Sequence, residues 1–140
     1  MYAEFTDDLV TGNETIDSQH KELISKINDL LISCEERSNK TGAARMLNYL
    51  ADYTDFHFKA EEALQEEIGY PGFEEHKKKH AELRATVQEL HDMLTDEEGP
   101  TDAFVETVKA NVWEWLIYHI QTFDRSVAEY KFMRNNAERT

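Results

Sequence analysis

The chain has 140 residues, enough for one domain with a proper core, and its 15 basic and 29 acidic side chains give a formal charge of -14. That balance leaves no basic face for nucleic acid and argues against anionic membrane surfaces as partners. One cysteine allows no intramolecular disulfide, the N-terminus has no signal-peptide pattern, and no stretch approaches the roughly 20 apolar residues of a membrane span. We therefore expect a soluble, cytoplasmic protein, and the acidic surface favours a monomer.

The first predicted element is an arm, residues 1–16, in which Phe5 and Leu9 would lie against the rest of the fold. Four amphipathic helices follow, because apolar residues recur at intervals of three and four, the period of an α-helix. Asp102 is the candidate N-cap of the last helix. The four segments cover about 17–37, about 41–68, about 72–94 and about 102–133.

Three polar breaks separate these segments, and two of the breaks contain the prolines, Pro71 and Pro100. Short connections of this kind favour antiparallel neighbours. The sequence thus predicts an all-α fold, an up-down-up-down four-helix bundle with an N-terminal arm. The arm and the bundle (17–134) would form a single domain of residues 1–140.

Each predicted helix places a histidine on the face that its apolar residues assign to the core. Alone, such a histidine is more often a hydrogen-bonded core residue than a metal ligand. Four helices that do so together indicate a metal site. With two carboxylates, the histidines supply seven candidate ligands: His20, His57, Glu61, His76, His80, His119 and Asp124.

Spacing along each helix decides which of these side chains converge. His57 and Glu61 are four residues apart, about 40° around an α-helix and one turn along it, so both reach one point in the core. The two histidines of the third helix repeat this spacing. Five residues separate His119 from Asp124, about 140° on an ideal helix, so they converge only if Asp124 reaches around or the helix is wound differently there. On spacing alone Asp124 stays open as a ligand, and Glu61 would face solvent if its helix were rotated.

The number and kind of donors indicate the metal. Structural zinc takes four ligands and catalytic zinc three plus water, so seven donors fit two ions that share the carboxylates. Imidazole-rich ligation favours iron over manganese, with cobalt or zinc less favoured. The Glu-x-x-His motif of ferritin-like di-iron proteins is absent from the chain. A donor set rich in neutral imidazole favours reversible oxygen binding over strong oxidation.

Three polar side chains near the candidate ligands have other expected roles. Asp17 is either an acceptor for a ligand ring or a helix cap. Glu62 lies about 100° from Glu61 around the helix and is expected to face solvent. His91 lies eleven residues beyond His80, about 16 Å further along the helix, so it is too distant to bind the same ion.

Taken together, these motifs resemble the hemerythrin family, and most closely its bacterial members, the bacteriohemerythrins. The resemblance runs from about Phe5 to Tyr130. It is carried by Ile16-Asp17-Ser18-Gln19-His20, His57-Phe58-Lys59-Ala60-Glu61-Glu62, Gly69-Tyr70-Pro71 with His76-x3-His80, and Trp115-Leu116-x2-His119-Ile120-x3-Asp124. The family spaces its last histidine and aspartate in the same way, so the resemblance implies that Asp124 is a ligand.

The resemblance also implies a non-haem di-iron centre. One iron would be bound by His76, His80 and His119, and the other by His20 and His57. Glu61 and Asp124 would bridge the two irons together with an oxo or hydroxo group. The second iron would keep an open position for dioxygen, and the apolar wall of the oxygen pocket would be formed by Trp115, Leu116 and Ile120.

The implied function is reversible dioxygen binding for storage, transport or sensing, without enzymatic turnover. Three alternatives remain open: a di-iron redox enzyme (peroxidase-like or nitric-oxide handling), a sensory module of a larger receptor, and a metal-free interaction domain. The chain departs from the family at Phe5, where bacterial members often have tryptophan, and at Gln65, where methionine is frequent. Neither residue belongs to the inferred ligand set, and both bear on pocket polarity and autoxidation.

Overall fold

The computed structural model describes residues 3–137 and the side chains of residues 3–134, so residues 1 and 2 of the predicted arm and residues 138–140 lie outside the description. Three helices are continuous: α1 (Glu14–Ser33), α2 (Lys40–Ile68) and α3 (Phe73–Asp96). The fourth consists of five consecutive segments: α4 (Asp102–Thr107), η2 (Val108–Trp113), α5 (Glu114–His119), η3 (Ile120–Asp124) and α6 (Arg125–Ala137). Segments η2 and η3 are π-helical turns within this last helix.

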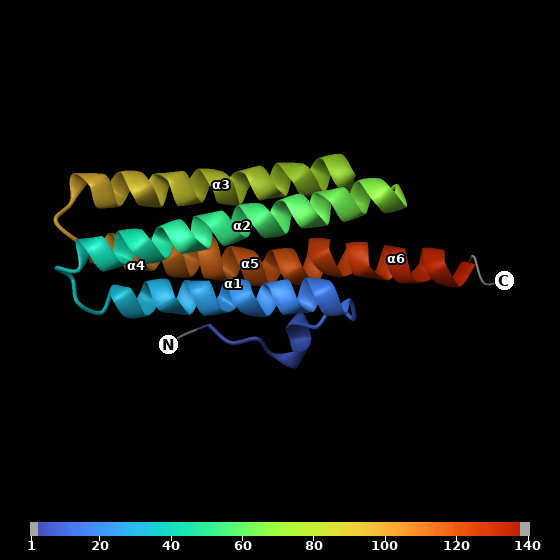
Figure 1. The fold of residues 1–140 in the computed structure, drawn as a ribbon, viewed down its shortest axis with the longest axis horizontal. Coiled ribbons are helices and arrows are strands. Elements are labelled where there is room, and N and C mark those ends of the chain that lie inside the picture. Colours follow the sequence, from blue (N-terminus) through green and yellow to red (C-terminus); the bar gives the residue numbers. More distant parts are fainter. Residues whose placement is uncertain (1–2, 138–140) are drawn as a thin grey trace.

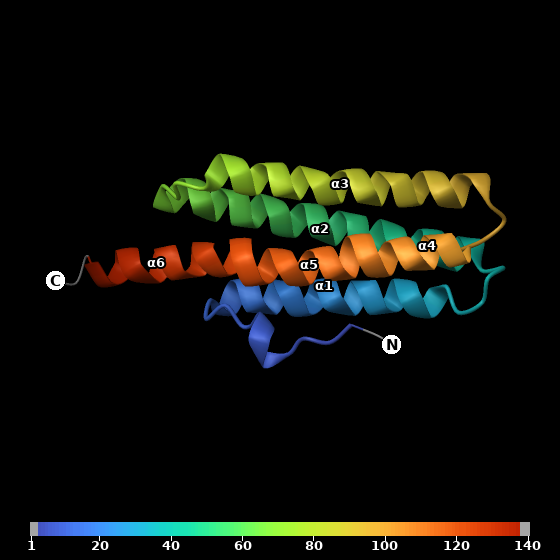
Figure 2. The same cartoon turned by 180° about the vertical axis from the view of Figure 1, so that it is seen from behind.

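The four helices lie side by side and each runs antiparallel to the one before it (Figures 1 and 2). Helix α2 packs against α1 and α3, and η2 closes the ring by packing against α3 and α1. The C-terminal segment α6 extends beyond the ends of the other helices (Figure 1). The predicted all-α four-helix bundle with its N-terminal arm is therefore confirmed.

One helix start and one helix cap differ from the prediction. Helix α1 begins at Glu14 rather than at 17, since the Asn13 side chain accepts a hydrogen bond from the Ile16 amide (3.0 Å). The last helix is capped by Thr101, whose hydroxyl oxygen accepts from the Phe104 amide (3.1 Å). Asp102 is the first residue inside that helix, so its prediction as the N-cap was wrong by one position.

The turn between α2 and α3 brings together two segments that carry candidate ligands. Helix α2 ends at Ile68 and is capped by Gly69, which adopts a left-handed conformation (φ 64°) that other residues rarely tolerate. The Tyr70 amide then donates back to the Gln65 carbonyl (2.9 Å), which closes the helix end. Because α3 starts at Phe73, the end of α2 and the start of α3 lie next to each other at this end of the bundle.

The inner space of the bundle has two distinct halves. Near the α1–α2 and α3–α4 connections the inner faces are apolar, and we call this the apolar half. It includes Leu30, Leu47, Leu90, Phe104 and Val108, each at most 1% exposed. Toward the α2–α3 turn the inner faces carry the seven candidate ligands, and we call this the donor half. The same helices run through both halves, which differ in the side chains on their inner faces.

The arm lies along the bundle and is held to it by polar contacts. The Ala3 amide donates to the Asn28 side chain (2.7 Å), and Leu9 is buried. The Asp17 carboxylate accepts from the Thr11 amide (2.9 Å) and hydroxyl (2.8 Å). Asp17 therefore anchors the arm, and both roles predicted for it, ring acceptor and helix cap, are wrong. In the described part of the chain no helix is both long and apolar enough for a membrane crossing.

Candidate metal centre

All seven predicted ligands lie together in the donor half, and each is at most 2% exposed. They form two overlapping groups in which the candidate donor atoms lie within 4.8 Å of one another. One group contains His76, His80 and His119, and the other contains His20 and His57. Glu61 and Asp124 belong to both groups. Two adjacent sites that share two carboxylates can hold two metal ions.

Glu61 presents a different oxygen atom to each group. Its Oε1 lies 2.8 Å from His76 Nε2 and 3.2 Å from His80 Nε2. Its Oε2 lies 3.3 Å from His57 Nε2 in the other group. The side chain is buried and points inward, so the alternative of a rotated helix with Glu61 in solvent was wrong.

Asp124 divides its two oxygens between the groups in the same way. Its Oδ1 lies 3.0 Å from His76 Nε2 and 3.1 Å from His119 Nε2, while its Oδ2 lies 2.7 Å from His20 Nε2. Both carboxylates therefore have the arrangement of bridging ligands, with one oxygen directed to each site.

A π-helical turn explains how Asp124 reaches this position. In an α-helix, His119 and Asp124 would point about 140° apart. Residues 120–124 form η3, in which hydrogen bonds run from i to i+5 and each turn takes in one more residue. Residues five apart then stack much as residues four apart do in an α-helix. Of the two routes left open by the spacing, the structure has the locally different winding.

The two carboxylates are held ionised by the rings around them. Burial and the neighbouring Asp124 would raise the pKa of Glu61, but His57 and His76 lower it to about 2. Burial would likewise raise the pKa of Asp124, but His119 and the other adjoining rings hold it well below its usual range. Two buried negative charges are thus available to compensate cations.

The histidines respond to burial and to these carboxylates in opposite directions. Burial would lower the pKa of His76, but hydrogen bonds to Asp124 and Glu61 raise it to about 9. The pKa of His57 is also raised, because Glu61 outweighs burial. For His119 burial dominates and the pKa is lowered. Positive charge within the cluster is therefore favoured on His76, which contacts both carboxylates.

Several of the candidate donor atoms lie close together but do not point directly at one another, as paired hydrogen-bonding atoms would. His20 Nε2 and Asp124 Oδ2 are 2.7 Å apart, yet neither has a partner in hydrogen-bond geometry, and the same holds for His57 Nε2 and Glu61 Oε2. His76 Nε2 and His119 Nε2 face each other at 2.9 Å. Buried polar atoms without partners are costly, and a cation between them would satisfy them. The residues present thus fit a pair of metal ions.

Two of the histidine rings have a side-chain oxygen next to their other nitrogen. His57 Nδ1 lies 2.6 Å from Gln19 Oε1, and His80 Nδ1 lies 2.8 Å from Glu62 Oε2. Such outer partners orient a ring and set its tautomer. The Glu62 carboxylate therefore faces His80, and its side chain is only 16% exposed, so the predicted solvent-facing role was wrong. Its place directly after Glu61 was the one signal in the sequence.

Aromatic rings stack on two of the candidate ligands, His80 and His119. Phe58 stacks on His80 with ring centres 3.8 Å apart and planes within 4°. His119 is stacked between Trp115 (4.5 Å, 12°) and Phe123 (5.3 Å, 14°). These rings limit the rotation of both imidazoles. Sequence reasoning missed Phe58 and Phe123 as site residues, although each is adjacent in the chain to a predicted ligand.

The three predicted pocket residues lie close to His119 in the chain, whereas His91 lies outside both donor groups. Leu116 and Ile120 are 2% and 0% exposed, whereas Trp115 is half-buried and donates through Nε1 to the Glu82 carboxylate (3.4 Å). His91 is half-buried and belongs to neither donor group. All three pocket residues lie on α5 and at the start of η3, next to His119.

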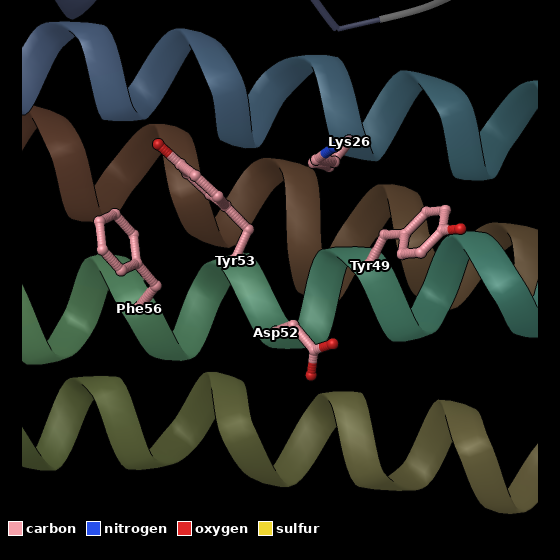
Figure 3. Close-up of a pocket in the computed structure, with 5 residues that line it drawn as sticks. All are labelled: Lys26, Tyr49, Asp52, Tyr53 and Phe56. Carbon is pink, nitrogen blue, oxygen red and sulfur yellow. The ribbon is translucent and has the colours of Figure 1, made fainter.

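A separate hollow of about 330 Å³ opens between α1 and α2 at the surface (Figure 3). The Tyr53 and Phe56 rings lie 5.5 Å apart there, and the Lys26 ammonium lies 5.8 Å from the centre of the Tyr49 ring. Figure 3 shows Tyr53 pointing toward α1 while Asp52 points away from it toward α3. One carboxylate and no histidine line this hollow, so it offers no metal-binding set.

Three comparisons with known proteins agree with this geometry. A family model described as the hemerythrin HHE cation binding domain matches residues 11–129. The bacteriohemerythrin of Pseudomonas paraeruginosa (strain DSM 24068 / PA7) is 35% identical over 118 residues, which is 84% of this chain and 74% of that protein. The bacteriohemerythrin of Stenotrophomonas maltophilia (strain R551-3) is 30% identical over 123 residues, or 88% and 77% of the two chains. The crystal structure of a wild-type hemerythrin superposes with a TM-score of 0.82 at 26% identity, covering 92% of this chain and 97% of that one.

Proposed function

This chain belongs to the hemerythrin family, and from that premise we propose that its donor half holds two iron ions and binds dioxygen reversibly. One iron would be held by His76, His80 and His119 and the other by His20 and His57. Glu61 and Asp124 would bridge the pair, together with an oxo or hydroxo group. The role would be oxygen storage, transport or sensing.

The observation that supports this most is the division of each carboxylate between two groups of histidines. One oxygen of Glu61 and one of Asp124 face the three-histidine group, and the other oxygens face the two-histidine group. A single ion would leave one group without a cation. Two irons bound there would supply the change of oxidation state that reversible oxygen binding requires.

The chain's own residues prepare the site in three ways. The buried carboxylates compensate cation charge, and their low pKa values keep them available as ligands at neutral pH. The stacked rings of Phe58 and Trp115 hold two imidazoles in place. Leu116 and Ile120 are apolar and buried, and we propose that they form the oxygen pocket with Trp115. An apolar wall excludes water and slows irreversible oxidation of the centre.

A binding protein fits the site better than an enzyme. Among the described residues, the buried polar or charged side chains are the seven proposed ligands together with Thr54 and Gln65. Neither Thr54 nor Gln65 titrates near neutral pH. Among the described residues, no further fully buried carboxylate or imidazole is therefore left to move protons for a substrate.

Metal analysis coupled to the visible spectrum tests this proposal. We expect two irons per chain, and an absorption band that forms when anaerobically reduced protein meets air and disappears under vacuum. Iron that bleaches irreversibly in air would favour a redox enzyme or redox sensor on the same scaffold. Absence of iron from protein made with iron supplied would overturn the proposal and leave the fold alone.

A further inference from the structure

Gln65 is an uncharged side chain at the donor half that none of the roles above uses. It lies one turn after Glu61 on α2, is 0% exposed, and its amide group lies 2.9 Å from His76 Nδ1. The nitrogen of the amide faces the ring, and Oε1 has no partner. A fully buried amide is costly unless it is hydrogen-bonded, so a specific role is expected for it.

The other nitrogen of His76 determines what this contact must be. Nε2 lies 2.8 Å from Glu61 Oε1 and 3.0 Å from Asp124 Oδ1, so Nε2 is the atom turned toward the donor cluster. A neutral imidazole that gives its Nε2 lone pair to a metal carries its proton on Nδ1. Nδ1 is then a donor, and it needs an acceptor.

Rotating the Gln65 amide group by 180° exchanges its oxygen and nitrogen, so that Oε1 becomes the acceptor next to His76 Nδ1. The two ends of an amide have nearly the same shape, and the hydrogen-bond network decides which end lies where. With Oε1 toward His76, the Nδ1 proton gains an acceptor, and the amide Nε2 takes the position in which Oε1 had no partner. The neighbouring rings show the same pattern, since oxygens of Gln19 and Glu62 face the Nδ1 atoms of His57 and His80.

We propose that Gln65 is a positioning residue for the metal centre, and that its Oε1 accepts the Nδ1 proton of His76. The bond fixes the ring with Nε2 toward Glu61 and Asp124. It also makes His76 a stronger ligand than it would be without the bond. The side chain is fully buried, so solvent does not compete for the bond. This inference rests on the proposed function of the site as a metal centre.

Two substitutions at this position separate hydrogen bonding from packing. Gln65→Met keeps the length and approximate volume of the side chain but offers only a weak acceptor. Gln65→Glu keeps an oxygen acceptor at the same reach. Gln88→Met is the matched control, because Gln88 is exposed on α3 and its amide donates to Asp92 (3.2 Å).

The affinity for ferrous iron is measured anaerobically by competition with a coloured chelator, at a temperature where all variants are folded. Loss of an outer hydrogen-bond partner costs roughly 10–100-fold in metal affinity, and we expect that loss for Gln65→Met. We expect Gln65→Glu to stay near the parent protein and Gln88→Met to be unchanged. The melting temperature of metal-free Gln65→Met should match or exceed that of the metal-free parent protein, because a buried polar group is removed.

The outcomes distinguish this inference from the proposed function. If Gln65→Met binds iron as tightly as the parent, the inference is overturned and the di-iron proposal stands. If Gln65→Glu is as weak as Gln65→Met, an acceptor is not what the site needs, and the inference is overturned as well. If the parent chain itself takes up no iron, the proposed function fails and this inference fails with it.

Discussion

The two halves of the bundle fill the same space between the same helices with opposite kinds of side chain. In the apolar half, residues such as Leu30, Leu47 and Leu90 are 0% exposed, and their apolar side chains require no polar partner or bound ion. In the donor half, five imidazoles and two carboxylates are equally buried, and several of their atoms lack a hydrogen-bond partner. The apolar half therefore stabilises the fold at all times, whereas the donor half does so fully only with cations present.

Helix α2 shows how little the backbone contributes to this difference. Leu47 and Leu50 point into the apolar half, and His57 and Glu61 continue the same inner face into the donor half. The last helix contains two π-helical turns: η2 begins at Val108 in the apolar half, and η3 lies in the donor half. Irregular winding therefore occurs in both halves, but in the donor half it brings a buried carboxylate, Asp124, beside His119.

Damage to the apolar half should affect the protein whether or not metal is bound. Leu47→Ala removes a side chain that is 0% exposed, and we expect it to lower the free energy of unfolding by about 2–5 kcal/mol. Denaturant unfolding of iron-loaded and metal-free protein should give the same loss. A loss confined to the iron-loaded form would contradict the independence of the two halves.

Removal of metal should weaken only the donor half. A ligand that binds the folded state alone stabilises it by about 4.1 kcal/mol when its free concentration is 1,000 times Kd. We therefore expect treatment of the anaerobically reduced protein with a chelator to lower the melting temperature but to leave the helical circular dichroism at room temperature. Unchanged melting would favour the metal-free interaction domain instead.

Two histidines on α3 test which rings belong to the donor half. His76 contacts both carboxylates, whereas His91 belongs to neither donor group. We expect His76→Ala to lose most of its iron and most of the melting increment that iron provides, and His91→Ala to keep both. Elemental analysis of the iron content compares the two variants, and equal loss of iron in both would contradict the ligand assignment.

The metal-free protein should be most stable near pH 6.5. His76, with its pKa raised from 6.5 to about 9, contributes stability below pH 6.5 that is lost as pH rises through 9. His119 has a lowered pKa, so it opposes folding as pH falls below 6.5. Glu61, lowered from 4.5 to about 2, contributes stability above pH 4.5 that is lost as pH falls toward 2. Melting temperatures of metal-free protein across pH would reveal this maximum, and a flat profile would contradict it.

The smallest expected effect lies at the helix cap of the apolar half. Thr101→Ala removes the hydroxyl that accepts from the Phe104 amide, and we expect a loss of about 1 kcal/mol. Asp102→Ala, at the position favoured by sequence alone, should change the free energy of unfolding by less. Denaturant titrations compare the two variants, and a larger effect at Asp102 would restore it as the stabilising residue.

Much of the fold and the set of candidate ligands followed from the sequence alone. The 3.6-residue period of apolar side chains is a local property, and it places four helices and their inward faces without any knowledge of contacts. The same period aligned His57 with Glu61 and made the buried cluster predictable. The cap at Thr101 and the start of α1 were missed, because several residues in a row were plausible caps there.

Only the tertiary structure decided how Asp124, Glu62 and Gln65 contribute. A π-helical turn is unfavourable by itself and persists where packing favours it, so the spacing of His119 and Asp124 could not reveal it. Glu62 and Gln65 lie on α2 but act on rings of α3, and such contacts between helices depend on distances in space. Periodicity acts along one helix, whereas the outer partners of His57, His76 and His80 are supplied by another helix. The sequence therefore determined the candidate donors, and the packing determined what holds them.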